Sequence, residues 1–354
     1  MNFLAEYGVF LAKTVTIIGG LVFLVTAIVT AGQRFKKIEK QGHIEITNLN
    51  DKFRDMADSL QANILSEAAY AEICKAEKKE QKQKDKAEKK RRKSGVEDKP
   101  APRVFVMDFV GDIRASGTEY LAEQVTAVLT QATEQDEVVI RLESAGGVVH
   151  GYGLAASQLQ RIRDRKIPLT VCVDKVAASG GYMMACIANK LLAAPFAILG
   201  SIGVVAQIPN VHRLLKKHDI DYEMLTAGEY KRTLTVFGEN TDKARQKFQQ
   251  EIDETHGLFK QFVSKSRPQL SIDEVATGEV WFGNTALERG LVDAVQTSDD
   301  YLFQRHLDKA SLFQVKWIEK HSVAERLGLA AETAIERVAL RWLARAENPS
   351  SFIR

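Results

Sequence analysis

The sequence predicts an α/β fold with a largely parallel sheet, preceded by an N-terminal transmembrane helix. From Arg103 onward, short apolar runs alternate with segments of helical periodicity, which is typical of parallel sheets covered by helices. Residues 9–31 form an apolar segment with a single charge, and residues 75–93 are almost wholly polar. We therefore expect a membrane anchor, a charged connection and a folded domain, in that order.

The composition is that of a globular protein with a sizeable core. The chain has 354 residues, 45% of them hydrophobic, and a formal net charge of +3. This near balance of charge gives no nucleic-acid signature, so no nucleic-acid partner is expected. Three cysteines, Cys74, Cys172 and Cys186, cannot all pair and lack metal-ligand spacing. They predict neither a disulfide framework nor a metal, and argue weakly against an oxidising compartment.

The anchor follows a short flank, residues 1–8, and covers residues 9–31, about the length needed to cross a bilayer as a helix. Its only charge is Lys13, near one end, where the side chain can reach the interface. A cleaved signal peptide is the alternative. Glu6 and Lys13 make a poor basic leader, and no small-residue cleavage site follows, so we favour an uncleaved anchor in contact with membrane lipid.

Two polar regions separate the anchor from the folded domain. Residues 32–74 predict a juxtamembrane helical region, because apolar residues recur there at near-helical spacing. Residues 75–102 predict a charged linker without an apolar face, either a solvated helix or a disordered segment. Contact of this basic stretch with anionic lipid headgroups is the alternative.

Residues 103–300 form the predicted α/β domain. Strands are expected at residues 104–110, 137–142, 169–173, 190–197, 203–207 and 221–226. Helices are expected at residues 119–133, 153–163, 183–188, 211–217 and 241–267, with mixed structure at 270–295. The long apolar run 183–209 could be a second membrane span, but Pro195 and polar residues interrupt it, and buried parallel strands are also continuously apolar.

The C-terminal extension, residues 301–354, is expected to be helical. Between residues 323 and 345 its apolar side chains form one stripe with charged residues elsewhere, which predicts a contact with the body or a sister subunit. The apolar positions of the stripe are Leu327, Ala331, Ala334, Ile335, Val338 and Trp342.

Ser179 is the strongest candidate for chemistry. It lies in Val176-Ala177-Ala178-Ser179-Gly180-Gly181-Tyr182, between an apolar strand-like run and a helix-like run. Small neighbours leave its hydroxyl accessible, and the following glycine lets a carbonyl approach backbone N–H groups. These features suit a nucleophile turn, although small-residue turns without chemistry are common in α/β proteins.

A serine nucleophile requires a base. Of the seven histidines, His150 is the one close enough to Gly146-Gly147 to line a cleft, but no nearby aspartate suggests a triad. Lysine is the alternative base when its neutral form is accessible. Lys231 follows a predicted strand and a glycine turn, although taken alone it is an ordinary surface lysine.

Several motifs together resemble the SohB branch of the signal peptide peptidase A family of serine proteases, over essentially the whole chain. They occur in the family's order and spacing: Glu143-Ser144-Ala145-Gly146-Gly147, Ala177-Ala178-Ser179-Gly180-Gly181-Tyr182, Gly200-Ser201-Ile202-Gly203-Val204, Gly228-Glu229-Tyr230-Lys231-Arg232 and Gly290-Leu291-Val292-Asp293. The resemblance implies a fold like the Clp protease and crotonase folds.

The resemblance also implies site residues. Ser179 would be the nucleophile of a Ser/Lys dyad, Lys231 its general base, and Ser201 the residue that orients the lysine. Gly180 and Gly146 or Gly147 would supply the oxyanion hole, whose individual donors are typically worth about 3 kcal/mol of transition-state stabilisation. The family's usual proline is Ala145 here, which keeps both glycines but removes a stiffening residue.

The implied activity is hydrolysis of membrane-associated peptides, such as remnant signal peptides, without a cofactor and by a homo-oligomer in the plasma (inner) membrane. A catalytically silent scaffold of the same fold is one alternative, and a crotonase-like acyl-CoA enzyme is another. Orientation is in conflict. The family places the catalytic domain in the periplasm, whereas the basic residues Arg34, Lys36, Lys37 and Lys40 after the anchor favour the cytoplasm.

Overall fold

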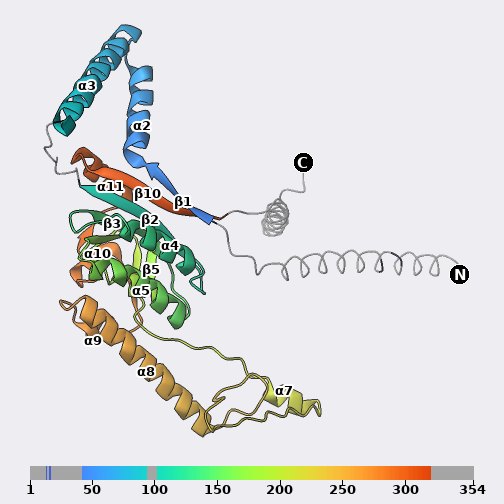
Figure 1. Cartoon of the computed structure of the whole chain (residues 1–354). Coiled ribbons are helices and arrows are strands. Elements are labelled where there is room, and N and C mark those ends of the chain that lie inside the picture. The colour runs from blue at the N-terminus through green and yellow to red at the C-terminus, as the bar shows by residue number, and fades with distance from the viewer. Residues whose placement is uncertain (1–12, 14–15, 17–41, 94–101, 320–354) are drawn as a thin grey trace, which may run out of the picture. The chain divides into compact units, whose positions relative to one another are not determined.

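The computed structural model describes residues 13, 16, 42–93 and 102–319 (Figure 1). In these ranges the strands form one ten-stranded sheet. Its main path runs β1 (Gly42–Asn48), β10 (Ser311–Glu319), β2 (Arg103–Gly111), β3 (Glu137–Ser144), β4 (Leu169–Val173), β6 (Lys190–Ala193) and β9 (Ala294–Val295). A branch from β3 contains β5 (Val176–Ala178), β7 (Ile198–Gly200) and β8 (Val280–Phe282).

The strands from β10 to β9 are parallel, as the sequence predicts, and β8 is antiparallel to its neighbour β7. Both faces of the sheet are buried, so its central strands are apolar at nearly every position. In β2, Phe105 and Met107 join a core cluster on one face, whereas Val104 and Val106 join a second cluster on the other.

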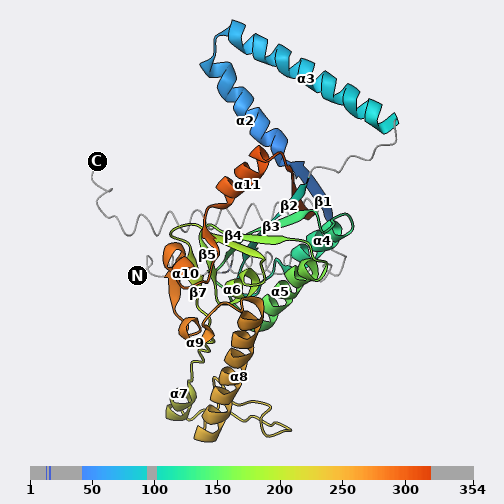
Figure 2. The ribbon, with the colours of Figure 1, turned by 90° about the vertical axis from the view of Figure 1, so that its left-hand side faces the viewer.

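One face of the sheet is covered by α4 (Thr118–Leu129), α5 (Val149–Asp164) and α6 (Gly180–Ala185), as Figure 2 shows. The long helix α8 (Asp242–Ser266) begins after Thr241, whose side chain caps the helix by accepting from the Ala244 N–H. Its C-terminal half packs against α6, where Phe259 and Val263 are buried. The small helices α9 (Ile272–Val275) and α10 (Gly283–Glu288) follow α8 along the chain.

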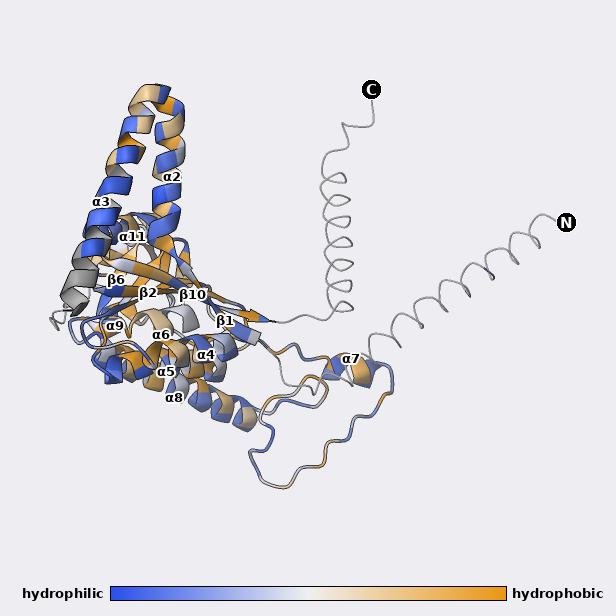
Figure 3. Cartoon of the chain, turned by 45° about the horizontal axis from the view of Figure 1, so that its top comes forward, coloured by the Kyte–Doolittle hydropathy of each residue, from blue (hydrophilic) through white to orange (hydrophobic). Residues whose placement is uncertain are grey.

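The other face is covered by α11 (Ser298–Leu307) and by the first turn of α2 (Leu49–Ile64). The Asn50 side chain fastens α2 to the start of β10, because its amide nitrogen donates to the Ala310 carbonyl and its oxygen accepts from the Leu312 N–H. Helix α3 (Glu67–Lys93) contains the first part of the predicted charged linker and is mostly hydrophilic, as Figure 3 shows.

Four predicted elements differ from the structure. Residues 42–48 form β1 and residues 311–319 form β10, although the sequence pattern predicts helical structure in both regions. No strand forms at the predicted positions 203–207 and 221–226. The strand in this part of the chain is β7, which ends at Gly200. Val205 and Leu225 are 81% and 96% exposed, so the apolar residues that suggested these strands are not buried in the sheet.

Within the described ranges, no helix combines the length and the apolar character needed to cross a bilayer. The predicted anchor at 9–31 lies outside these ranges apart from residues 13 and 16, and the predicted C-terminal stripe at 323–345 lies wholly outside them.

Candidate active site

Ser179 occupies a sharp turn between β5 and α6. Its φ of 51° and ψ of −118° place a non-glycine residue in a disfavoured region of backbone space. The Ser179 N–H donates to the Gly200 carbonyl at 2.8 Å, and the Ser179 carbonyl accepts from the Met183 N–H at 3.0 Å. The residue is half-buried, and its hydroxyl does not cap the helix. This is the geometry of a strand-to-helix nucleophile turn.

The parallel branch of the sheet brings two other predicted site segments to this turn. On one side, Ala177 pairs with Ser144 at the end of β3, just before Gly146 and Gly147. On the other side, Ala178 pairs with Gly200, just before Ser201. These pairings gather Ser179, the two glycines and Ser201 at one edge of the sheet.

Gly146 lies against the serine turn so closely that no side chain would fit. A Cβ atom there would stand 2.7 Å from the Ser179 Cβ and 2.8 Å from the Gly180 nitrogen, and the Gly146 φ is +92°. Glycine is thus required both for the contact and for the backbone conformation. Ala145, which stands where a proline is usual in the family that the motifs resemble, is exposed.

The hydrogen bonds of this turn distinguish the two candidate donors. The Gly146 N–H donates to the Ser144 hydroxyl at 3.1 Å, and the Val148 N–H donates to the Ile113 carbonyl at 2.8 Å. In the described part of the chain, the N–H groups of Gly147 and Gly180 have no such acceptor. Of the two glycines that the sequence left as alternatives, Gly146 thus has its N–H engaged, whereas the Gly147 N–H has no acceptor among the described residues.

Ser201 has a φ of 50°, and its N–H donates to the Glu279 carbonyl at 2.6 Å. Its hydroxyl has no hydrogen-bond partner among the described residues and is free to contact an incoming amine. The next carbonyl, that of Ile202, lies 3.2 Å from His256 Nε2 on α8.

Lys231 is exposed and lies in the loop between α7 (His212–Lys217) and α8. Its neighbours attach this loop to the first turns of α8, because Glu229 pairs with Lys243 at 2.5 Å and the Tyr230 ring lies 5.5 Å from Lys247 Nζ. In Figures 1 and 2 the α7 loop extends away from the sheet.

The helix geometry gives the scale of this separation. His256, which lies beside the Ile202 carbonyl next to Ser201, is 13 residues beyond Lys243. This spacing corresponds to about 20 Å along the helix axis. Within the described chain the structure gives no contact between Lys231 and Ser179. The structure therefore brings Ser179, Gly147, Gly180 and Ser201 together and leaves Lys231 apart.

Other reactive groups do not form a competing site in the described residues. His150 is exposed in the first turn of α5. Burial raises the pKa of both the Cys172 and Cys186 thiols to about 12, so they remain protonated. No group of three or more metal-ligating side chains occurs in the ranges that the structure covers.

Family models and curated relatives match nearly the whole chain. Residues 2–159 match the N-terminal model of peptidase family S49, and residues 161–311 match the peptidase family S49 model. The "Probable protease SohB" of Haemophilus influenzae is 50% identical, over 96% of each chain. That of Buchnera aphidicola subsp. Schlechtendalia chinensis is 46% identical, over 86% of this chain and all of the relative.

Solved structures are more distant. A mutant of the "1510-N membrane-bound stomatin-specific protease" aligns with a TM-score of 0.39 and 15% identity, over 58% of this chain and 85% of that chain. This likeness is too low to add to what the relatives and the sheet show.

Proposed function

Because the chain belongs to peptidase family S49, as a SohB-like protease, we propose that it hydrolyses peptide bonds with Ser179 as nucleophile and Lys231 as general base. The conformation of the Ser179 turn is the observation that supports Ser179 as the nucleophile. Its backbone is strained, the residue is only half-buried, and beside it the Gly147 and Gly180 N–H groups have no acceptor among the described residues. The Ser201 hydroxyl, next to the strand that pairs with the Ser179 strand, would accept a hydrogen bond from the lysine amine.

The reaction proceeds in two steps. Neutral Lys231 removes the proton from the Ser179 hydroxyl as its oxygen attacks the substrate carbonyl, and the Gly147 and Gly180 N–H groups hold the oxyanion. The protonated lysine then gives its proton to the leaving amine. Water, deprotonated by the same lysine, hydrolyses the acyl-enzyme, and Ser179 recovers its proton.

We further propose that a neighbouring copy of the chain supplies Lys231. In one chain the Lys231 loop is attached to the first turns of α8. These turns lie about 20 Å along the helix axis from His256, the α8 residue beside Ile202. The same region exposes apolar side chains, with Val205 and Leu225 more than four-fifths exposed and Leu214 and Ile220 about half exposed. Clustered exposed apolar residues are typical of interaction surfaces. A homo-oligomer would cover these side chains and complete the dyad.

The substrate class follows from the predicted anchor. A single apolar helix at 9–31 would hold the enzyme on the membrane, where membrane-associated peptides, including remnant signal peptides, are its expected substrates. Small or apolar residues are expected next to the scissile bond. The alternative is a catalytically silent scaffold, which the free hydroxyl and unpaired N–H groups of the Ser179 turn disfavour.

The first prediction tests the dyad. Ser179→Ala and Lys231→Ala should each abolish hydrolysis of a fluorogenic peptide by the full chain in detergent micelles, because each removes one half of the proton transfer. Lys52→Ala is the control, since this exposed lysine on α2 lies outside both the Ser179 turn and the proposed subunit contact and should retain full activity. Undiminished hydrolysis by either dyad variant would refute the assignment. Failure of a serine-reactive phosphonate to label Ser179 would favour the scaffold.

A further inference from the structure

We infer that Ser144 and Tyr152 are positioning residues that hold both halves of the oxyanion hole in place. The inference rests on the proposed function, since it concerns the same Ser179 site. Neither residue touches the substrate in the proposed mechanism. Ser144 is 2% exposed at the end of β3, and Tyr152 is fully buried on α5. Their hydroxyl oxygens lie 2.5 Å apart.

The protons of this pair can be assigned without ambiguity. The Tyr152 hydroxyl donates its one proton to the Asp112 carbonyl at 2.7 Å. The bond between the two hydroxyls must therefore be donated by Ser144 and accepted by Tyr152. The Ser144 oxygen in turn accepts from the Gly146 N–H at 3.1 Å. The result is a directed relay from Gly146 through Ser144 and Tyr152 to Asp112, in which every proton has an acceptor.

The relay selects the oxyanion donor. By taking the Gly146 N–H inward, it fixes the orientation of the peptide groups that lead to Gly147, whose own N–H is left without an acceptor among the described residues. The exposed Ala145 does not restrict φ as a proline would, so this hydrogen bond is the local restraint on the turn. Loss of the Ser144 hydroxyl would leave the half-buried Gly146 N–H without this partner, and the turn would lose its restraint.

The Tyr152 ring supports the second donor. A Cβ atom on Gly180 would collide with the ring, and its distance to the Tyr152 Cβ would be only 2.8 Å. The ring therefore packs directly on the Gly180 backbone while its hydroxyl holds Ser144. The Tyr152 side chain thus contacts Gly180 directly and acts on the Gly147 turn through Ser144. Burial raises the pKa of Tyr152, so the phenol stays neutral and keeps its donating proton.

The Asp112 end of the relay is itself rigid. The Asp112 carboxylate accepts from the Ser116 N–H at 2.9 Å and from the Ser116 hydroxyl at 2.7 Å. These bonds lower the pKa of Asp112 and close the loop that follows β2. The same loop provides the Ile113 carbonyl that binds the Val148 N–H. Gly147 is consequently flanked on both sides by hydrogen-bonded peptides.

The test compares Tyr152→Phe with a matched tyrosine. Tyr301→Phe is the control, because the Tyr301 hydroxyl is also buried and also donates a 2.5 Å hydrogen bond, to Glu137. Glu137 begins β3 and Ser144 ends it, so the control lies about 23 Å from the site. Both variants are measured for unfolding in urea, for kcat and KM on one fluorogenic peptide, and for inhibition by a peptide aldehyde.

We expect Tyr152→Phe to lower kcat roughly 10-fold, and Ser144→Ala roughly 100-fold, with KM within twofold of the wild type. The aldehyde forms a tetrahedral adduct whose oxygen occupies the oxyanion hole, so its affinity should fall by the same factor as kcat/KM. Tyr301→Phe should lose comparable stability with kcat unchanged.

Equal kcat losses in Tyr152→Phe and Tyr301→Phe, or unchanged aldehyde affinity in Tyr152→Phe, would overturn the inference and leave the dyad standing. A wild-type chain without Ser179-dependent hydrolysis would overturn the proposed function and this inference together. The two failures are therefore distinguishable within the same set of measurements.

Discussion

At the scale of single residues, Ser179 combines backbone strain with an accessible hydroxyl. Its φ of 51° costs about 1–3 kcal/mol for a residue with a side chain. The cost is sustained because the Gly200 carbonyl and the Met183 N–H hold the turn from both sides. Such strain is typical of sites where geometry is maintained for chemistry rather than for stability.

The second prediction follows from this strain. Ser179→Gly should unfold at a higher urea concentration than Ser179→Ala. The difference in free energy of unfolding should be about 1 kcal/mol, and both variants should be inactive. Glycine relieves the strain, and this gain exceeds the roughly 0.4–1 kcal/mol that its greater freedom in the unfolded chain costs. The comparison is made by urea denaturation of the full chain at equal protein concentration. Equal midpoints for the two variants would show that the turn is unstrained.

The sequence could predict that Ser179 and its glycines lie in a tight turn between a strand and a helix, because small residues suit such turns. It could not predict the relay, which required the direction of α5 over Gly180 as well as the bond between Ser144 and Tyr152. Tyr152 gave no signal, since a tyrosine on an apolar helix face is usually an ordinary core residue. The choice of Gly147 over Gly146 likewise depended on a hydrogen bond, not on residue type.

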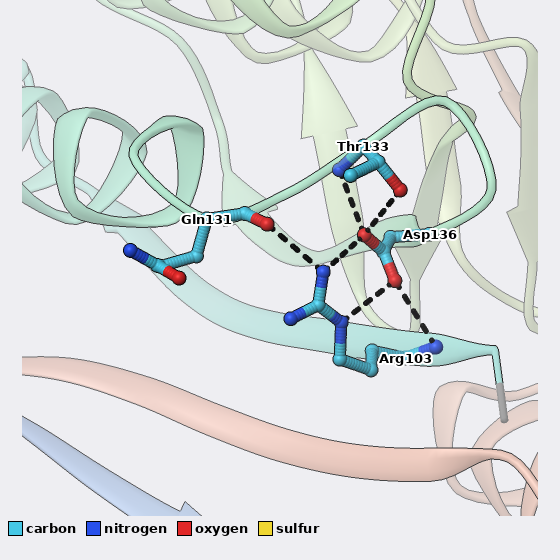
Figure 4. A network of polar contacts seen from close by, with 4 residues as sticks. All are labelled: Arg103, Gln131, Thr133 and Asp136. Atoms are coloured by element: carbon cyan, nitrogen blue, oxygen red, sulfur yellow. Dashed lines mark hydrogen bonds and ion pairs between the residues drawn. The ribbon is translucent and has the colours of Figure 1, made fainter. Parts of the chain in front are cut away.

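At the scale of elements, an ion pair fixes the starts of β2 and β3, at the sheet end opposite Ser179. Figure 4 shows Asp136 accepting from Arg103 Nη2 at 2.7 Å and from the Thr133 N–H at 2.7 Å. The Asp136 side chain is only 5% exposed. Burial tends to raise its pKa, but the bonds from Arg103 and Thr133 outweigh burial and lower the pKa to about 2.

The third prediction is a dependence of stability on acid. Because the pKa of Asp136 is lower in the folded than in the unfolded chain, its contribution is complete above about pH 4 and is lost as the pH falls toward 2. Asp136→Asn should remove this component and cost roughly 2 kcal/mol at neutral pH. Urea midpoints between pH 2 and 7 measure both effects, with exposed Asp55→Asn as the control. Parallel acid profiles for the wild type and Asp136→Asn would contradict the assignment.

Element prediction succeeded where burial is local and failed where partners are distant. Leu169–Val173 was predicted to the residue, because five consecutive buried positions mark a central parallel strand. β10 was missed because its pairing with β2 joins segments more than 200 residues apart. The predicted strands at 203–207 and 221–226 were wrong because their apolar residues are exposed in this chain.

At the scale of the whole molecule, the two residues of the proposed dyad are held by different elements of the chain. Ser179 and Ser201 are fixed by the sheet, whereas the Lys231 loop is attached to the start of α8. A rigid 25-residue helix cannot shorten this separation, because its length is set by the rise per residue. Either the loop detaches from α8 or a second copy brings its own Lys231 to the serine.

The fourth prediction separates these arrangements by mixing two inactive variants. If a neighbouring copy supplies the lysine, oligomers assembled from equal amounts of Ser179→Ala and Lys231→Ala chains should recover roughly a quarter of wild-type activity, because random head-to-tail assembly places an intact serine beside an intact lysine at that frequency. Co-assembly in detergent followed by the peptide assay measures the recovery.

The control mixes Ser179→Ala with the double variant Ser179→Ala/Lys231→Ala, which lacks serine in every chain and should stay inactive. If each chain completed its own dyad, the first mixture would also stay inactive while the wild type remained fully active. That result would assign the dyad to a single chain and require the Lys231 loop to leave Lys243 and Lys247 on α8. Recovered activity would instead make the oligomer, rather than the chain, the smallest unit that can hydrolyse a peptide.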